Sequence, residues 1–319
     1  MRIGVVADDL TGACDSAVQF VAAGRMQVHL WPCQISADAA CVAISTESRA
    51  GSVGTAYKRS FAAVSLLKEA GVDVLFRKID SQLRGNVAAD ISGAMSAWGG
   101  ACVVAPAVPD ERRITEGGCQ RWNGRSVDVV ALLREGGLDA VSAAPAAACE
   151  GMVVVSDAAG NEDLAAIAEE VAHARSRVLP AGAAGLAREV AHALGIAAPP
   201  TSGWPACTKP LAIVGSPAAM DQAQMAAARG KDVLLLGPEE LPATAGHDGL
   251  LVTGGETAAR VLRWLGADFL ELCGEAFPRV PVGVCRGGPS DGLVFALKSG
   301  GFGPPDAIDR ALEALLRGA

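Results

Sequence analysis

Two adjacent carboxylates follow the first apolar segment of the chain. Asp8 and Asp9 come directly after residues 3–7, which have the pattern of a short buried strand, and a helix is expected over 11–23. Ligands of open α/β sheets bind beyond the carboxyl ends of the strands, so these side chains are candidates for acid–base chemistry or hydroxyl recognition. Asp9 or Thr11 could instead only cap the helix, but one cap needs one residue. The second aspartate therefore favours a functional role.

A second polar segment, RKIDSQLRGN at residues 77–86, follows the strand expected over 72–77. Its cations Lys78 and Arg84 can bind a carboxylate, and Asp80 can accept hydrogen bonds from hydroxyl groups. This combination suits a polyhydroxy acid. The alternative is structural: Asp80 and Arg84 form an ion pair between residues i and i+4 at the start of a helix.

Paired glycines occur in two turns near the end of the chain, TGGETA at 253–258 and LKSGGFG at 297–303. Such glycines let backbone N–H groups approach phosphate oxygens, and a helix that starts at Glu256 adds the positive end of its dipole. Lys298 could add a point charge. Ser216, after another expected strand, could add a contact or only an N-cap. Neither turn matches the phosphate-binding patterns GxxxxGK[ST] or GxGxxG, and glycine turns often only reverse the chain. The evidence for a phosphate site is therefore that both turns occur at strand ends in the same part of the chain.

These segments lie at strand ends in a pattern of alternating strands and helices, which predicts an α/β fold. Strands are expected over 3–7, 28–31, 41–45, 72–77, 102–105, 152–155, 177–179, 211–214, 233–236, 250–253 and 293–297. Helices are expected over 11–23, 53–70, 86–97, 127–135, 163–174, 184–193, 217–228, 256–265 and near the C-terminus.

The alternation stops at residues 196–210, IAAPPTSGWPACTKP, where four prolines argue against a continuing helix or a central strand. We place a domain boundary there, between one domain at 1–197 and a second at 198–319. Each domain is expected to be a mostly parallel sheet flanked by helices, with the active site in the cleft between them. The 196–210 segment is a candidate hinge for closure of that cleft.

The composition excludes several classes of protein. The chain has 319 residues, 50% of them hydrophobic and 19% charged, which predicts a folded protein of about two domains. A net charge of −8 argues against nucleic-acid binding, and no apolar run is long enough to cross a membrane. Nine scattered cysteines without a CxxC pair indicate reduced thiols, and four histidines without metal-binding spacing argue against a zinc site. We expect a cytoplasmic enzyme.

Seven sequence blocks, in order, resemble the four-carbon acid sugar kinase family: ADDLTGA (7–13), ESR (47–49), KIDSQLRGN (78–86), GAAGLA (182–187), VGSP (214–217), GGETA (254–258) and LKSGGFG (297–303). They span nearly the whole chain. Members of that family are ATP-dependent kinases of threonate-, erythronate- or 3-oxo-tetronate-type acids. They have an N-terminal sugar-acid domain and a C-terminal nucleotide domain, and the resemblance implies the same arrangement here.

The resemblance also implies which residues form the site. The acid substrate would face Asp8, Asp9, Arg49, Lys78, Asp80, Ser81 and Arg84. The nucleotide would be surrounded by Ser216, Gly254, Gly255, Glu256, Thr257, Lys298, Ser299, Gly300, Gly301 and Gly303. The chain departs from the family pattern at Gln82, usually Thr, at Glu256, usually Asp, and at Cys119, where a histidine is often found. It is also shorter than typical members.

We therefore predict an ATP-dependent phosphotransferase that phosphorylates a hydroxyl group of a four-carbon sugar acid or of a closely related hydroxy acid. Phosphoryl transfer depends mainly on positioning and charge neutralisation. Asp8 or Asp80 would accept the proton of the attacking hydroxyl group. Lys78 and Arg84 would hold the carboxylate or the γ-phosphate, and Mg²⁺ would bridge ATP oxygens with few protein ligands.

Two other classes stay open at this stage. A dehydrogenase would carry GxGxxG after the first strand, where ADDLTGA stands instead. A non-catalytic or regulatory homologue would bind the nucleotide or the sugar acid without phosphoryl transfer, and the altered segment 111–119 keeps that alternative open. The expected ligands are a small sugar acid and ATP, and a homodimer is one option for the assembly.

Overall fold

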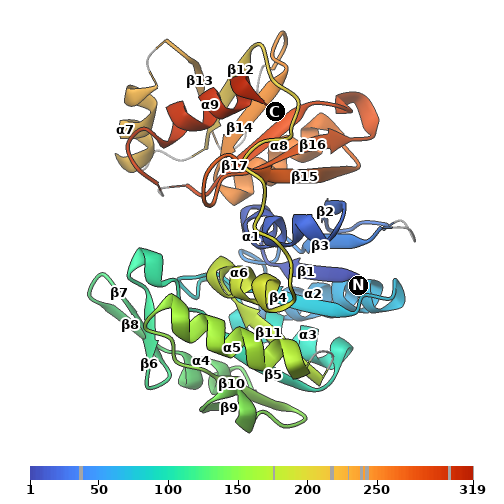
Figure 1. Cartoon of the computed structure of the whole chain (residues 1–319), viewed down its shortest axis with the longest axis vertical. Coiled ribbons are helices and arrows are strands. Elements are labelled where there is room, and N and C mark those ends of the chain that lie inside the picture. The colour runs from blue at the N-terminus through green and yellow to red at the C-terminus, as the bar shows by residue number, and fades with distance from the viewer. Residues whose placement is uncertain are drawn as a thin grey trace.

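In the computed structural model the chain forms two halves stacked along the long axis of the molecule (Figure 1). The first half ends with α6 (Ala184–Ala193), and the second begins with β12 (Pro210–Val214). Residues 196–209 contain neither helix nor strand and connect the halves along one side of the molecule. The structure describes residues 1–35, 39–174, 177–215, 219–228, 230–237, 240, 244–300 and 303–318.

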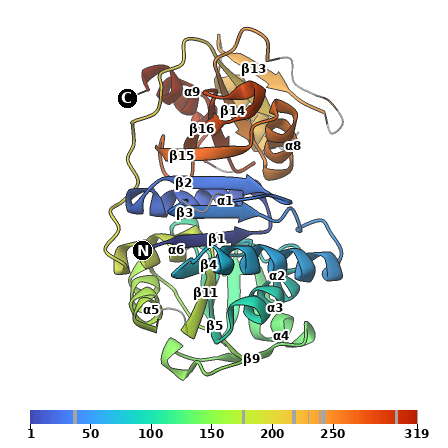
Figure 2. The same ribbon diagram turned by 90° about the vertical axis from the view of Figure 1, so that its right-hand side faces the viewer.

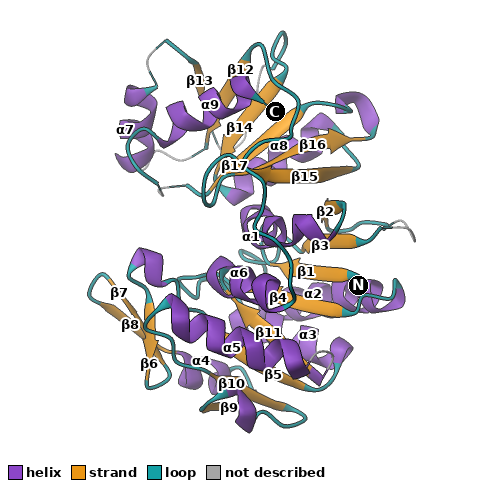
Figure 3. Cartoon of the chain, in the orientation of Figure 1, coloured by secondary structure: helices purple, strands orange, loops and turns teal. Residues whose placement is uncertain are grey.

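A single 14-stranded sheet runs through both halves, in the order β13-β12-β14-β17-β16-β15-β2-β3-β1-β4-β11-β5-β10-β9 (Figure 3). The first half contributes β1 (Ile3–Ala7), β2 (Met26–Leu30), β3 (Cys41–Ser45), β4 (Val74–Lys78), β5 (Ala101–Ala105), β9 (Asp139–Ser142), β10 (Met152–Val155) and β11 (Val178–Gly182). The second half contributes β12, β13 (Asp232–Leu235), β14 (Gly249–Thr253), β15 (Phe269–Glu275), β16 (Pro281–Arg286) and β17 (Val294–Lys298). Pairs that involve β15 or β16 are antiparallel, and the other pairs are parallel.

The two halves meet where β15 pairs with β2. Leu270 lies opposite Val28, and Leu272 lies opposite Met26. All four side chains are buried, and the pairing leaves neither strand as an exposed sheet edge. The predicted α/β class with mostly parallel sheets and flanking helices is confirmed. The difference from the expected layout is that the two sheets are joined edge to edge.

Helices cover both faces of the first-half sheet (Figure 2). One face carries α2 (Val53–Glu69), α3 (Val87–Trp98) and α4 (Val129–Glu135), and the other carries α1 (Leu10–Ala17), α5 (Asn161–Ala174) and α6. The core beneath α1, α5 and α6 continues across the seam to α8 (Gly255–Leu265) in the second half. The second half also contains α7 (Ala219–Ala227) and α9 (Ala307–Arg317), which lie next to each other.

The expected elements are present within the described residues, with ends shifted by a few positions. The helix expected over 11–23 is α1 followed by a 3₁₀ helix, η1 (Val18–Ala23). Strands β9, β15 and β16 were not expected. Neither was a small antiparallel sheet of β6 (Ile114–Glu116), β7 (Cys119–Trp122) and β8 (Arg125–Asp128).

Two predictions from the composition can be compared with the structure. All nine cysteines are free thiols, as their irregular spacing predicts. Within the described part of the chain, no helix combines the length and the apolar character that crossing a membrane requires.

Candidate functional site

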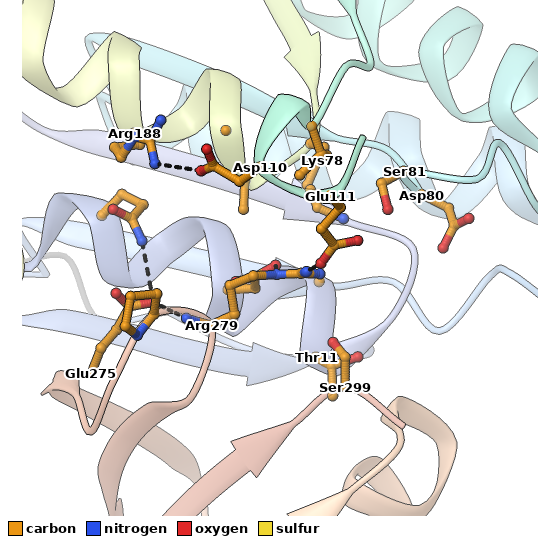
Figure 4. Close-up of a pocket in the computed structure, with 18 of the residues that line it drawn as sticks. Thr11, Lys78, Asp80, Ser81, Asp110, Glu111, Arg188, Glu275, Arg279 and Ser299 are labelled. Atoms are coloured by element: carbon orange, nitrogen blue, oxygen red, sulfur yellow. Dashed lines mark hydrogen bonds and ion pairs between the residues drawn. The ribbon is translucent and has the colours of Figure 1, made fainter. Parts of the chain in front are cut away.

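A cavity of about 650 Å³ lies between the two halves (Figure 4). It is lined by the carboxyl ends of β1, β4 and β11 on one side and of β14, β15 and β17 on the other. Ten of the residues predicted from the sequence line it: Asp9, Arg49, Lys78, Asp80, Ser81, Arg84, Gly254, Gly255, Ser299 and Gly300. The structure therefore brings together the acidic and basic segments of the first half and the glycine turns of the second.

Arg49 holds the two adjacent aspartates that follow β1. Its Nε and Nη2 atoms donate to the two carboxylate oxygens of Asp8 at 2.7 and 2.8 Å, and Nη1 donates to Asp9 at 2.6 Å. Asp9 also caps α1 by accepting a hydrogen bond from the backbone N–H of Gly12 at 2.9 Å. Asp8 is 2% exposed and does not line the cavity, so its contribution to the cavity acts through Arg49.

The loop after β4 is built around Asp80. Arg84 donates to both of its carboxylate oxygens, from Nε at 3.0 Å and from Nη2 at 2.7 Å, and the backbone N–H of Gln82 adds a third bond. The ion pair considered as a structural alternative is therefore present, on a residue that also lines the cavity. Burial alone would raise the pKa of the Asp80 carboxyl, but Arg84, Arg49 and Lys78 lower it well below its usual range.

Lys78 is a buried cation at the end of β4. It is 5% exposed and lines the cavity, and within the described residues its ammonium group has neither an ion pair nor a hydrogen bond. Its neighbour is Gly12 on α1: a Cβ atom at that position would lie 3.1 Å from Nζ and 2.5 Å from an oxygen of Asp9. Glycine at position 12 therefore leaves room for both charged groups.

The opposite wall is formed by the start of α8. Gly254 precedes the helix with a positive φ of 87°, and no side chain caps the helix among the described residues. A Cβ atom on Gly255 would lie 2.4 Å from Asp9 Oδ2 and 2.9 Å from Thr11 Oγ1. The free backbone N–H groups and the positive end of the α8 dipole favour an anion at this point of the cavity.

Several predicted residues lie elsewhere. Thr257 is buried against Gly215, Glu256 is exposed in the first turn of α8, and Gly303 is exposed. Lys298 is buried at the end of β17, where Nζ donates to the backbone oxygen of Ser299 at 3.0 Å. These four do not line the cavity, like Asp8. Ser216 and Gly301 lie outside the described residues.

Other cavity residues were not predicted from the sequence: Asp15 and Gln19 of the first helical segment, Asp110 and Glu111 after β5, Arg188 of α6, and Glu275 and Arg279 of the second half. Arg279 reaches from the turn after β15 to form ion pairs with Glu111 and, at 3.9 Å, with Asp15 (Figure 4). The signal that could have found Glu275 is the alternation of buried and half-buried residues along β15.

Ser81 and the segment around residue 113 support each other. Arg113 is 5% exposed, and its Nη1 donates to Ser81 Oγ at 2.5 Å. Gln120 of β7 donates to the backbone oxygen of Ser81 at 2.6 Å. The altered segment 111–119 therefore places Glu111 in the cavity and Arg113 behind Ser81, whereas Cys119 does not line the cavity.

Comparisons with known proteins find relatives of both halves. Two family models match the chain, a sugar-binding N-terminal domain at residues 3–132 and a nucleotide-binding C-terminal domain at residues 239–308. A D-threonate kinase of Bordetella bronchiseptica is 30% identical, over 98% of this chain and 97% of that protein. The chain belongs to the four-carbon acid sugar kinase family. As a member of this family it is a kinase, a phosphotransferase with an alcohol group as acceptor.

Solved structures share the family's fold. A protein of Salmonella typhimurium LT2 matches with a TM-score of 0.75 at 21% identity, covering 97% of this chain and 98% of its own. A crystal structure from Bordetella bronchiseptica, a domain-swapped dimer with bound citrate, matches with a TM-score of 0.54 at 28% identity, over 100% and 99% of the two chains. The alignment with the Bordetella kinase extends over 399 positions against 319 residues here, so that relative contains residues this family member lacks.

Proposed function

We propose that the protein is an ATP-dependent kinase that phosphorylates a hydroxyl group of a four-carbon sugar acid. The observation that carries this proposal is that Lys78 and the start of α8 belong to facing walls of one cavity. The Lys78 ammonium group is buried and interacts with the charge of Asp80, but it forms no ion pair or hydrogen bond within the described residues. It therefore favours a directly bound anionic ligand, because a buried charge without close partners is costly. The uncapped start of α8 favours a second anion. A sugar acid and a triphosphate are two such ligands.

In this proposal the first half binds the acid. Lys78 and Arg84 neutralise its carboxylate or the γ-phosphate, and Ser81, held by Arg113, binds one of its hydroxyl groups. The second half binds the phosphates of ATP through backbone N–H groups of two turns, one that starts at Gly255 and one at Ser299 and Gly300. Gly254 shapes the first turn, since its own N–H donates to the oxygen of Lys298 at 2.9 Å. Ser216, Glu256, Thr257, Lys298, Gly301 and Gly303 stay predicted contacts or supports of these turns.

Asp8 and Asp80 were the predicted proton acceptors. Each carboxylate accepts two hydrogen bonds from a guanidinium group, Asp8 from Arg49 and Asp80 from Arg84. These bonds occupy both oxygens of each carboxylate, and at Asp80 the nearby cations also lower the pKa and make it a weaker base. We therefore assign Asp8 and Asp80 to holding the two arginines in place.

Magnesium enters this proposal with the triphosphate, as part of the substrate. Within the described residues, no cluster of three His, Cys, Asp or Glu side chains could hold a metal ion. Asp9 and Asp80, which line the cavity, are already bound by arginines. Phosphate and water oxygens therefore supply most ligands of the ion, as expected for Mg²⁺, which gives up its water ligands reluctantly.

D-threonate is the first acid to test, because the Bordetella relative that matches nearly the whole chain is a D-threonate kinase. The related structure with bound citrate indicates that the fold accommodates a hydroxy acid. That structure is a domain-swapped dimer, which supports a homodimer for this chain as well. The free thiols of all nine cysteines fit a reducing compartment, and we propose a cytoplasmic location.

The proposal is tested by ADP release from the full chain with ATP, Mg²⁺ and a panel of four-carbon acids. We expect turnover of D-threonate or a close relative. Lys78→Met should lower kcat/KM about 100-fold, which corresponds to about 3 kcal/mol of lost charge neutralisation. Lys58→Met is the matched control, since Lys58 is exposed on α2, and should leave kcat/KM within about twofold.

Two results would contradict the proposal. A folded protein that binds ATP but turns over no acid would indicate the non-catalytic homologue considered above. Unchanged kcat/KM in Lys78→Met would remove the lysine from the site.

A further inference from the structure

We propose that Asp15 is the catalytic base of this site and accepts the proton of the substrate hydroxyl group. This inference rests on the proposed function and names the residue for its proton transfer. Asp15 lies on α1, lines the cavity and is 6% exposed. Its Oδ1 atom is buried and has no hydrogen-bond partner among the described residues.

This carboxylate differs from the others that line the cavity. Within the described residues, Asp9, Asp80, Asp110 and Glu275 each accept a hydrogen bond of 2.9 Å or less. Glu111 forms an ion pair with Arg113 at 2.7 Å, although its Oε2 atom has no hydrogen bond. Asp15 forms a long ion pair with Arg279, whose Nε atom lies 3.9 Å from Oδ2. Hydrogen-bond donors and close cations stabilise an ionised carboxylate and reduce its basicity. The Oδ1 atom of Asp15 keeps a hydrogen-bonding capacity that no donor among the described residues uses.

The helix places Asp15 next to the two groups assigned to the reacting ligands. Thr11, Gly12 and Asp15 all line the cavity, and a spacing of i, i+1 and i+4 puts them on one side of α1. Both neighbours are close: a Cβ atom on Gly255 would lie 2.9 Å from Thr11 Oγ1, and one on Gly12 would lie 3.1 Å from Lys78 Nζ. Asp15 follows about one helical turn later, roughly 5 Å along the axis. A hydroxyl group between Lys78 and the phosphate turn is thus within reach of its carboxylate.

Arg279 belongs to the same arrangement. It lies between Glu275 and the pair Thr11 and Ser299 in the cavity (Figure 4). Its ion pair with Asp15 comes from the second half, so the distance between the two groups depends on how the halves are placed. Glu275 differs from Asp15 in accepting hydrogen bonds on Oε1 from Gln19 and from the backbone N–H of Arg279.

The proposed step transfers one phosphoryl group and one proton. The substrate hydroxyl oxygen forms a bond to the γ-phosphorus of ATP while the bond from that phosphorus to the β,γ-bridging oxygen breaks, and ADP leaves with that electron pair. The hydroxyl proton moves to Asp15, which releases it to solvent after the product leaves. Because the transition state is loose, the base matters most late in the step, and general-base catalysis typically contributes 10²- to 10⁴-fold.

The test is steady-state kinetics of Asp15→Asn in the full chain, as a function of pH, with ATP, Mg²⁺ and the acid that the wild type turns over. We expect kcat to fall at least about 100-fold, with KM for both substrates within about threefold. The wild type should lose kcat toward acidic pH as its base becomes protonated, and the variant should lose this limb of the profile. Asp139→Asn is the matched isosteric control: Asp139 is exposed on β9, outside the cavity, and the variant should keep kcat within about threefold.

A second variant tests whether a loss of activity in Asp15→Asn comes from a folding defect. Asp15→Glu retains a carboxylate, so it should lose only part of kcat and keep the acidic limb. A melting temperature for each variant shows that the protein is folded.

The failures of the two proposals can be told apart. An active wild type with unchanged kcat or an unchanged acidic limb in Asp15→Asn would overturn the role of Asp15 alone. Loss of the limb in Asp80→Asn but not in Asp15→Asn would assign the base to Asp80. A folded wild type without turnover would overturn the proposed function and the role of Asp15 with it.

Discussion

The surroundings of Glu275 disfavour the ionised form of its carboxyl group. It is 8% exposed at the end of β15, and burial raises its pKa from 4.5 to about 7. This value is the net result: burial is the largest cause and the charge of Asp15 adds to it, whereas hydrogen bonds from the Arg279 backbone and from Gln19 oppose it. Because the folded-state pKa exceeds the unfolded value, the stabilisation from this group is fully present below pH 4.5 and is lost as the pH rises to about 7.

We therefore predict that Glu275→Gln changes stability in a pH-dependent way. The amide can keep the hydrogen bond to Arg279 but carries no charge. At pH 8 the variant should be more stable than the wild type by about 3 kcal/mol, and at pH 4 the two should be similar. Urea unfolding at both pH values measures this difference. The same difference at pH 4 and pH 8 would show that the charge of Glu275 is not the cause.

The sequence predicted which residue types gather at the site, but not which of them pair. Asp9 follows β1 and Lys78 ends β4, and the carboxyl ends of these neighbouring parallel strands share one edge of the sheet. That Arg49 would bind Asp8 depends on β3 lying next to β1, which local sequence does not encode. Asp15 was not predicted as a site residue, because an aspartate inside a helix is expected to be solvent-exposed until its surroundings are known.

At the scale of elements, a buried ion pair supports the loop that carries Arg49. Arg77 of β4 is fully buried, and its Nη2 atom lies 2.9 Å from Asp90 Oδ1 on α3. Ser48, next to Arg49, donates to the same carboxylate at 3.1 Å. Ser60 of α2 donates to the backbone oxygen of Asp90 at 2.6 Å. The network ties β4, α2 and α3 to the loop after β3.

Removing one partner of this pair should be costly. Asp90→Asn leaves the Arg77 guanidinium buried without a counterion and should lower the free energy of unfolding by about 3 kcal/mol or more. Urea unfolding measures this loss. The double variant Arg77→Met with Asp90→Leu replaces both charges by apolar groups and should recover much of the stability, because breaking a buried pair costs more than replacing it. A loss below about 1 kcal/mol in Asp90→Asn would contradict this account.

The elements themselves were predictable to different degrees. Strands such as β1 and β3 are buried along their whole length and read as continuous apolar runs, which is typical of a parallel sheet covered on both faces. Strand β15 alternates buried and half-buried residues, and its pairing with β16 shifts register between Leu272 and Gly274. The break in the alternation weakens the strand signal, and two cavity residues were missed with it, Glu275 at the end of β15 and Arg279 in the turn that follows.

At the scale of the whole molecule, the joined sheet limits how the two halves can move. The segment 196–210, which we expected to act as a hinge, is bound to the second half. The backbone oxygen of Pro200 accepts a hydrogen bond from the backbone N–H of Glu275 at 2.9 Å, and the buried Trp204 donates from Nε1 to the oxygen of Ala314 at 3.3 Å. The halves are also linked through β15 and β2. Closure of the cavity should therefore be a small rotation about this seam.

The joining of the sheets could not be predicted from the sequence. Each half has its own set of apolar strands, and the partner of an edge strand is decided by contacts between distant segments. Val28 and Leu270 are separated by more than two hundred positions in the chain, and the sequence of neither strand indicates that it pairs with the other. The division at 197/198 stays a prediction. It falls in the segment between α6 and β12 that has neither helix nor strand.

The central claim is that cations of the first half and glycine turns of the second bind the two reactants in one cavity. A crystal structure of the full chain with a non-hydrolysable ATP analogue, Mg²⁺ and D-threonate tests it most directly. The account predicts the triphosphate at Gly254 and Gly255, the carboxylate of the acid at Lys78, and a hydroxyl oxygen about 3 to 3.5 Å from the γ-phosphorus. A nucleotide or acid bound outside this cavity, or an acid whose hydroxyl groups all point away from the γ-phosphate, would contradict it.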